Sequence, residues 1–360
     1  MRVLFYLLDG DTNASSRQRV IQYMPFLARH GIEGRVSRPV PPRLYQRWLE
    51  NGRGTAREKA QFYALFWLNR VRDVWRANAA DVVVIQRDLF PFGPPVLERL
   101  LRRRNPRIAY DTDDATWIRP AFTPNTIFQR MRDWAKPAEV AANARWVSAA
   151  TEPIADWARQ YAHDVTVVPM AIDPTEYRCM QPRARDTLVL GWAGTPGGLR
   201  YLQRLAPVLR EVSKRHQVVL RVVSGRRPTF DVPGVHLDWR CWRADRLIED
   251  IASFDVGLVP LDDSPFERAK FPFKLLQYMA LGIPSVSARV GVVRRIIDEG
   301  RNGLLADSPE AWGDALERLV QDIELRRRIG AAGRELVMER YTVERVGPLL
   351  LDGLARAART

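Results

Sequence analysis

Cysteine and lysine are scarce in this chain. Only two cysteines occur, Cys179 and Cys241, and their spacing fits neither a metal site nor a redox motif. We therefore expect unpaired thiols in a reducing cytoplasm rather than a disulfide-stapled secreted fold. Only five of the 360 residues are lysine, and two of them, Lys270 and Lys274, lie four residues apart.

Long apolar runs are also missing. No run approaches the ~20 residues that a helix needs to cross a bilayer. The N-terminal segment becomes acidic too early for a signal peptide and is typical of a first buried strand. A hydrophobic fraction of 46% with eleven tryptophans can nevertheless fill the cores of two domains.

The net charge of +14 comes almost entirely from arginine and is spread along the chain. Nothing in the sequence resembles a nucleic-acid-binding module, so we expect no nucleic-acid partner. A basic surface attracts either an anionic substrate or anionic lipid, and the pattern does not choose between them. We expect a cytoplasmic protein, with peripheral attachment to the inner face of the membrane as an open alternative.

Apolar runs alternate with helical periodicity along the chain, which predicts parallel sheets covered by helices. In the first half, strands are predicted at 3–8, 81–86, 108–111, 146–150 and 165–169, and helices at 17–30 and 95–103. Residues 171–185 lack periodicity and contain two prolines, Pro174 and Pro182. A second series then predicts strands at 187–192, 218–224, 256–260 and 285–288, with helices at 199–215, 245–251, 309–320 and 324–340.

The segment 254–284 carries the most specific pattern. A buried strand is followed by a charged loop, and Lys274 opens an apolar-periodic helix that ends at Gly282 and Pro284. A basic loop that leads into a helix N-terminus favours anions, because free N–H groups and the helix dipole both point there.

This segment resembles the donor-binding motif of the GT-B glycosyltransferases, in particular the retaining enzymes of family 4. Those enzymes carry Glu-x7-Glu leading into a helix. Here Gln277 stands at the second glutamate position and Ala269 at the first, with Glu267 two residues earlier as a substitute. A branch of the family with ER-x-K-x3-KL-x-QYMA is more similar still.

The resemblance implies an α/β GT-B fold of two doubly wound Rossmann-like domains facing a central cleft. Residues 1–170 would form the acceptor domain, completed by a crossover helix at 341–360. Residues 171–186 would be a linker, and residues 187–340 the donor domain. The implied activity is metal-independent transfer of a sugar, with retention, from a nucleotide-diphosphate sugar to a hydroxyl of a glycan, a lipid-linked or a small-molecule acceptor. No cofactor is expected.

The donor site is expected around a glycine-rich loop that follows the strand at 187–192. Glycines let a backbone approach a phosphate, and a helix N-terminus supplies N–H donors. Thr195 stands where many relatives have arginine, so cations must come from elsewhere. The predicted donor-binding residues are Gly194, Thr195, Gly197, Gly198, Arg226, Glu267, Arg268, Lys270, Lys274 and Gln277. Lys274 is also predicted to be catalytic, through the leaving diphosphate, and Gln277 to reach the ribose.

The acceptor side is expected at Ser16, Arg17, Arg19 and Asp114, the first three in the loop after the first strand. Three carboxylates lie within four residues, at Asp111, Asp113 and Asp114. Their negative charges repel one another unless a cation or hydrogen bonds compensate them. Three interpretations compete: a metal-binding Asp-x-Asp pair, a phosphatase nucleophile loop, and an acceptor-side GT-B loop. The match of YDTDDATW to the same branch favours the third. Asp111 and Asp113 would then be catalytic, by orienting the acceptor hydroxyl or shielding positive charge.

Other functions stay open at this point. A nucleotide-sugar 2-epimerase, a metal-dependent transferase or phosphatase centred on Asp111 and Asp113, and a non-catalytic nucleotide-sugar or lipid-binding protein are the alternatives. The segment 43–76 is rich in aromatic residues and arginine. Its spacing favours a core face, with a membrane-interface helix as the alternative.

Overall fold

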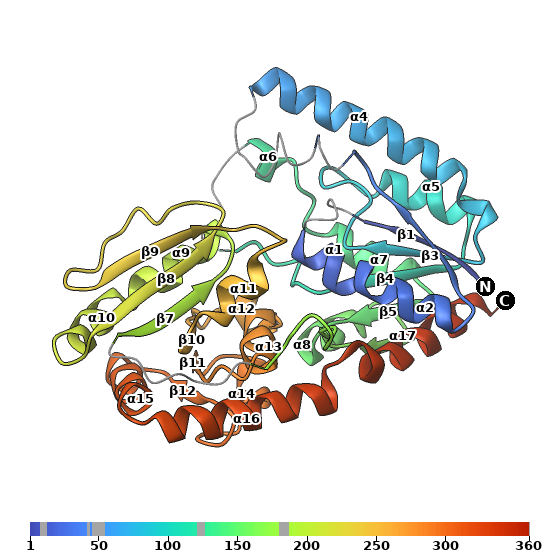
Figure 1. The fold of residues 1–360 in the computed structure, drawn as a ribbon. Coiled ribbons are helices and arrows are strands. Elements are labelled where there is room, and N and C mark those ends of the chain that lie inside the picture. Colours follow the sequence, from blue (N-terminus) through green and yellow to red (C-terminus); the bar gives the residue numbers. More distant parts are fainter. Residues whose placement is uncertain (8–12, 42–43, 45–54, 121–126, 180–186, 360) are drawn as a thin grey trace. The chain divides into compact units, whose positions relative to one another are not determined.

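The computed structural model describes residues 1–7, 13–41, 44, 55–120, 127–179 and 187–359, and Figure 1 shows their course. Contacts divide the chain into two compact units. We call residues 1–170, 269–271 and 343–360 the first unit, and residues 171–268 and 272–342 the second unit. Tyr45 and Trp48, part of the aromatic segment, lie outside the described residues.

The first unit contains a parallel six-stranded sheet in the order β2-β1-β3-β4-β5-β6. The strands are β1 (Arg2–Tyr6), β2 (Glu33–Ser37), β3 (Val82–Gln86), β4 (Ile108–Thr112), β5 (Trp146–Ala149) and β6 (Val165–Val167). Every residue of β3, β4 and β5 is buried. Strands that are covered on both faces form near-continuous apolar runs, which is why these segments could be predicted.

Helices flank this sheet. They are α1 (Ala14–Arg19), α2 (Met24–Arg29), α4 (Ala56–Trp75), α5 (Val96–Arg104), α6 (Ile127–Arg130), α7 (Lys136–Asn143), α8 (Glu152–Ala158) and α17 (Val343–Ala358). The last helix packs closely because it presents glycine. A Cβ on Gly353 would lie 2.1 Å from ring atoms of Trp146 in β5.

The second unit contains its own parallel sheet in the order β12-β11-β10-β7-β8-β9. The strands are β7 (Leu188–Ala193), β8 (Val218–Ser224), β9 (His236–Cys241), β10 (Val256–Val259), β11 (Ser285–Ala288) and β12 (Leu304–Ala306). Its helices are α9 (Leu199–Arg204), α10 (Ala206–Ser213), α11 (Leu247–Ala252), α12 (Pro265–Ala269, which ends in the first unit), α13 (Phe273–Ala280), α14 (Val293–Ile296), α15 (Pro309–Gln321) and α16 (Ile323–Arg340).

Two segments that were predicted as single helices are each divided in the structure, so these two predictions were wrong. The predicted helix 17–30 is divided into α1, a 3-10 turn at Ile21–Tyr23 and α2. Val20 leaves the helical region at φ −129°, and α2 restarts with a proline in its first turn. The predicted helix 199–215 is likewise divided into α9 and α10, and α10 also has a proline in its first turn. Proline lacks the N–H that would continue a preceding helix.

Candidate functional site

A buried ion pair lies at the carboxyl end of the first unit's sheet. Arg19, the last residue of α1, donates to both oxygens of Asp111 in β4, from Nη2 at 2.5 Å and from Nε at 3.1 Å. Both side chains are almost fully buried. Burial disfavours the charge on Arg19, but the adjacent carboxylate outweighs burial and raises the pKa of the guanidinium.

The other donors of Arg19 reach two further parts of the first unit. Nη2 donates to Ser148 Oγ in β5 at 2.7 Å, and Nη1 donates to the carbonyl of Val168 just after β6 at 2.5 Å. A guanidinium has five N–H donors, and these contacts use most of them. In the structure Arg19 and Asp111 thus tie α1 to three strands, and the direct contact of either with a substrate stays a prediction.

Arg87 follows β3 and is the single non-glycine residue with a positive φ, 62°, in the part of the chain that is described. The N–H of Asp88 donates to the carbonyl of Gln86 at 2.9 Å, which closes a three-residue γ-turn around Arg87. Such a backbone costs a non-glycine residue about 1–3 kcal/mol, and strain of this kind concentrates at functional sites.

The strained turn places the Arg87 guanidinium against two carboxylates. Nε donates to Asp113 Oδ1 at 2.6 Å, and Nη2 donates to Asp114 Oδ2 at 2.9 Å. Burial alone would raise the pKa of Asp113, but the charge and hydrogen bond of Arg87 outweigh it and hold that pKa below its ordinary value. Asp113 is therefore ionised at neutral pH. Nothing in the sequence around Arg87 predicts a positive φ, so sequence reasoning missed it.

The two serines of α1 are bound to the end of β3. Ser16 Oγ donates to Gln86 Oε1 at 3.2 Å, and Gln86 Nε2 donates to Ser15 Oγ at 2.8 Å. Ser16 is buried, whereas the neighbouring Arg17 is half-buried. The structure therefore brings the predicted residues of α1 and of the aspartate loop to one edge of the sheet. Lys270 also belongs to the first unit, with a half-exposed side chain.

The glycine-rich loop of the second unit follows β7, as predicted. Thr195 and Gly197 are exposed, and the loop closes through a 3-10 turn, Pro196–Gly198, that leads into α9. Lys274 lies in the first turn of α13, and its Nζ is 4.2 Å from the ring centroid of Trp192. A Cβ on Gly194 would lie 3.0 Å from the same Nζ. The predicted lysine and the predicted glycine loop are therefore side by side.

The next loop of this unit carries Arg226. It follows β8, and the Arg226 carbonyl accepts a hydrogen bond from the Ser224 hydroxyl. A Cβ on Gly225 would lie 3.8 Å from the Pro196 ring, so the loops after β7 and β8 are neighbours. The Arg226 side chain is exposed. The glycine loop and the loop that carries Arg226 are thus neighbours at the carboxyl end of this sheet, where doubly wound folds bind ligands.

Glu267 is buried, and both oxygens of its carboxylate accept hydrogen bonds. Arg200 Nη2 donates to its Oε1 at 2.8 Å, and the hydroxyls of Tyr201 and Ser264 donate to its two oxygens. This geometry ties Glu267, a residue of α12, to α9. Its predicted contact with the donor sugar stays a prediction.

Arg268 and Gln277 have partners within the second unit. Arg268 Nε donates to Asp263 Oδ1 at 2.5 Å on the surface. Gln277 is buried, and its Nε2 donates to the hydroxyl of Tyr177 at 3.1 Å. The ribose contact expected of Gln277 remains a prediction.

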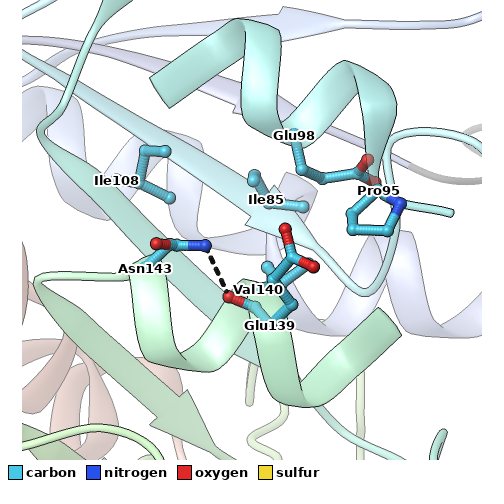
Figure 2. A pocket seen from close by; sticks show the side chains of 7 residues that line it. All are labelled: Ile85, Pro95, Glu98, Ile108, Glu139, Val140 and Asn143. Carbon is cyan, nitrogen blue, oxygen red and sulfur yellow. Dashed lines mark hydrogen bonds between the residues drawn. The ribbon is translucent and has the colours of Figure 1, made fainter. Parts of the chain in front are cut away.

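A small pocket in the first unit lies away from these residues. Figure 2 shows it between α5 and α7, where Asn143 Nδ2 donates to the carbonyl of Glu139 at 2.9 Å. Its lining consists of Ile85, Pro95, Glu98, Ile108, Glu139, Val140 and Asn143. None of these is a predicted site residue, and the wall is mostly aliphatic, so the pocket reflects helix packing.

Within the described ranges, no group of three or more His, Cys, Asp or Glu side chains is arranged to hold a metal ion. In the same ranges no helix has the length and apolar character needed to cross a bilayer.

Comparison with known proteins finds a family likeness in the second unit. Residues 187–322 match the family model described as glycosyl transferases group 1. The N-acetyl-alpha-D-glucosaminyl L-malate synthase of Bacillus anthracis is 34% identical over 155 residues, which cover 40% of this chain and 38% of that protein. A D-inositol 3-phosphate glycosyltransferase of Xylanimonas cellulosilytica is 26% identical over 250 residues, 61% of this chain and 58% of that one. The matched regions thus span less than two thirds of either relative.

Solved structures match nearly the whole chain. A sucrose-phosphate synthase from Thermosynechococcus elongatus superposes with a TM-score of 0.71 at 15% identity, covering 99% of this chain and 98% of that one. Anabaena Alr3699/HepE, solved in complex with UDP-glucose, gives a TM-score of 0.69 at 15% identity and 99% coverage of both chains. The chain has two parallel six-stranded sheets, and its likeness to these structures confirms the predicted α/β fold of GT-B type.

Proposed function

We propose that this chain is a retaining glycosyltransferase that moves a sugar from a nucleotide-diphosphate sugar to an acceptor hydroxyl without a metal ion. The observation that carries the proposal is the pairing of Lys274 with the glycine loop at the end of β7. It lies within the region that matches glycosyl transferases group 1. HepE, a structural neighbour, is described in complex with UDP-glucose, which supports a nucleotide-sugar donor.

The donor half of the chemistry would belong to the second unit. As the bond between the anomeric carbon and the phosphate oxygen breaks, negative charge grows on the diphosphate. Lys274, the exposed Arg226 and the N–H groups of Thr195 and Gly197 would stabilise that charge. The N–H groups of Gly194 and Gly198 already donate to backbone carbonyls, those of Val223 and Thr195. A fixed donor aimed at a developing oxyanion lowers a barrier by about 3–4 kcal/mol. Cations supplied by side chains would take the place of a divalent metal.

The acceptor half would belong to the first unit. Asp113, kept ionised by Arg87, and the partly exposed Asp114 offer carboxylate oxygens to sugar hydroxyls. In the front-face displacement that the resemblance implies, the acceptor oxygen bonds to the anomeric carbon and its proton passes to the departing diphosphate. The pairing of Asp111 with Arg19 and of Asp113 with Arg87 argues against a metal at these aspartates, because a guanidinium already occupies each carboxylate.

Thermal unfolding tests the donor proposal. The chain would be heated with UDP, GDP, TDP or ADP and the matching sugars, in EDTA and separately with Mg²⁺ or Mn²⁺. One nucleotide should raise the midpoint in EDTA, because ligands that bind only the folded state stabilise it. A shift that required metal would refute metal independence.

Substitution then separates catalysis from simple binding. Lys274→Ala should lower the transfer or hydrolysis rate of the donor found above about 100- to 1000-fold. Lys214→Ala is the matched control, since Lys214 is exposed and pairs with Glu211 in the same unit. A wild-type chain that binds a donor but releases no sugar to water or to any polyol acceptor would favour a non-catalytic binding protein.

We also propose that the first unit attaches to an anionic membrane surface through the outward face of α4 (Figure 1). The inner face of this helix is core, with Phe62 and Phe66 buried, as the spacing predicted. The outer face leaves Leu65, Leu68 and Trp75 at 37%, 65% and 52% exposure. Arg57 and Arg72 on this helix and Arg76 just after it are exposed, whereas the acidic residues of the helix, Glu58 and Asp73, are partly buried. Apolar and arginine side chains together suit an anionic headgroup layer.

Vesicle sedimentation tests this attachment. The chain should bind vesicles that contain phosphatidylglycerol more tightly than pure phosphatidylcholine, and Leu68→Glu should weaken that binding. Leu349→Glu is the matched control, because Leu349 is an exposed leucine at 40% on α17 of the same unit. Equal binding of the two variants would refute the assignment to α4.

A further inference from the structure

Trp192, near the end of β7, forms the floor beneath the glycine loop. Its side chain is fully buried. A Cβ on Gly194 would lie 2.7 and 2.8 Å from the ring atoms Cζ2 and Cη2, and a Cβ on Gly198 would lie 2.9 Å from Cζ2. Real side chains do not approach this closely, so the loop backbone rests directly on the indole. Glycine at 194 and 198 is therefore required by the ring as well as by any phosphate.

Lys274 is placed by the same ring. Its Nζ lies 4.2 Å from the Trp192 centroid, within cation–π range, and a Cβ on Gly194 would lie 3.0 Å from that Nζ. Lysine has a flexible four-carbon stem, so an ammonium without a fixed neighbour would sample many positions. The indole face restricts it to the space above the loop.

We infer that Trp192 is a positioning residue, which holds the Lys274 ammonium beside the glycine loop so that the ammonium and the N–H groups of Thr195 and Gly197 bind one diphosphate together. This inference rests on the proposed function and assigns a new residue to its donor site. An aromatic ring carries no net charge, so it orients the lysine without cancelling its charge as a carboxylate would.

A second observation separates this role from ordinary core packing. Within the described residues the Trp192 indole N–H has no hydrogen-bond partner, although it is buried. A buried unpaired donor is costly, and phenylalanine or leucine would avoid that cost. The chain nevertheless has tryptophan here, the ring that attracts cations most strongly. Packing alone does not explain that choice.

Binding measurements on the full chain test the inference. The probes are inorganic pyrophosphate, the four nucleoside diphosphates UDP, GDP, TDP and ADP, and the matching nucleosides. Trp192→Leu should raise the Kd for the diphosphates about tenfold or more and leave nucleoside binding unchanged, with Trp192→Phe in between. Lys274→Ala added to Trp192→Leu should cost little more, because coupled residues are not additive.

Gly194→Ala offers an independent variant that leaves the indole in place. Its methyl group would meet both the ring and Nζ of Lys274, so it should weaken diphosphate binding. Gly197→Ala should have a smaller effect, because its methyl group meets nothing within 4 Å. Gly313→Ala, in α15, is the neutral control, since its methyl group also meets nothing within 4 Å.

A spectroscopic readout needs no ligand. With five lysines in the chain, ¹³C-dimethylated lysine signals can be assigned by replacing Lys274 with arginine. The Lys274 signal should be shifted upfield by the indole ring current and should return to the exposed-lysine position in Trp192→Leu. An unshifted Lys274 signal in the wild type would overturn the inference.

The outcomes distinguish the two proposals. If the wild-type chain binds no diphosphate, the proposed donor site fails and the inference fails with it. If the wild type binds but folded Trp192→Leu and Gly194→Ala bind equally well, the inference alone is refuted. A Trp192→Leu variant that does not fold leaves Trp192→Phe and Gly194→Ala to decide.

Discussion

Replacing Asp111 with alanine would leave Arg19 as a buried cation without its counter-ion. The two side chains are only 6% and 2% exposed, so water cannot replace the lost carboxylate. Removing one partner of a buried ion pair typically costs about 3–5 kcal/mol. That is a large share of the roughly 5–15 kcal/mol that stabilises a folded domain. The first unit should therefore be strongly destabilised, whatever the role of Asp111 in catalysis.

Urea unfolding followed by circular dichroism measures this cost. With an m-value of about 3 kcal/mol/M, the midpoint of the first unit should fall by about 1 M or more. Asp263→Ala is the control, because Asp263 forms an exposed pair with Arg268, with side chains 59% and 58% exposed. An exposed pair contributes about 0–1 kcal/mol, so that midpoint should hardly move.

The opposite result would refute the reasoning. If Asp111→Ala changed the unfolding free energy by less than about 1 kcal/mol, the pair would not be a buried structural contact of the kind described. If the same variant also abolished sugar transfer, Asp111 would act on the substrate directly, as the sequence led us to predict. Asp111→Asn keeps the shape and one acceptor oxygen, so its cost should be smaller than that of alanine.

Three further predictions concern the first unit. Arg87→Gly should be more stable than Arg87→Ala, with an unfolding free energy in urea that is higher by about 1 kcal/mol or more, because glycine adopts a positive φ without strain. For Asp113, whose folded pKa is lowered, the stability contribution is complete above the ordinary pKa near 3.9 and is lost as the pH falls towards the folded value. Wild type should thus lose more stability than Asp113→Asn between pH 5 and pH 3 in urea titrations. Gly353→Ala should lower the melting midpoint, at a cost of about 1–3 kcal/mol, because its methyl group would overlap Trp146.

Each of these has a result that contradicts it. Equal stability of the two Arg87 variants would mean that the γ-turn is not strained. Parallel pH curves for wild type and Asp113→Asn would mean that Arg87 does not hold that carboxylate in the folded state. A Gly353→Ala variant as stable as wild type would mean that α17 packs less closely on β5 than the structure shows.

The strands that were predicted from the sequence differ in burial from most of those that were not predicted. β3, β4 and β7 are buried along their whole length, so their sequences are apolar runs that predict strands directly. The edge strands β2 and β9 were missed, because most of their residues are at least partly exposed and each strand carries two charged side chains. β12 was also missed, although buried, because its apolar run is only three residues long, between Gly303 and Asp307.

The candidate site shows the same division between local and distant information. Gly194 and Lys274 could be named from sequence, since each lies in a local strand–loop–helix pattern that favours an anion. Arg87 and Trp192 could not, because one acts through a backbone conformation and the other through a ring 82 residues from the lysine it contacts. Arg19 and Asp111 were named, but their mutual pairing depends on α1 and β4 lying side by side, although 92 residues separate the two side chains along the chain.

What the sequence by itself determined was the class of fold and the edge of each sheet where function gathers. Alternating apolar and amphipathic segments carry that information locally, because burial of strands and helix faces must be written into consecutive residues. Only the tertiary structure decided which charges compensate one another. A carboxylate at the end of a strand has the same sequence signature whether it meets a substrate or a buried guanidinium, and the difference depends on residues far along the chain.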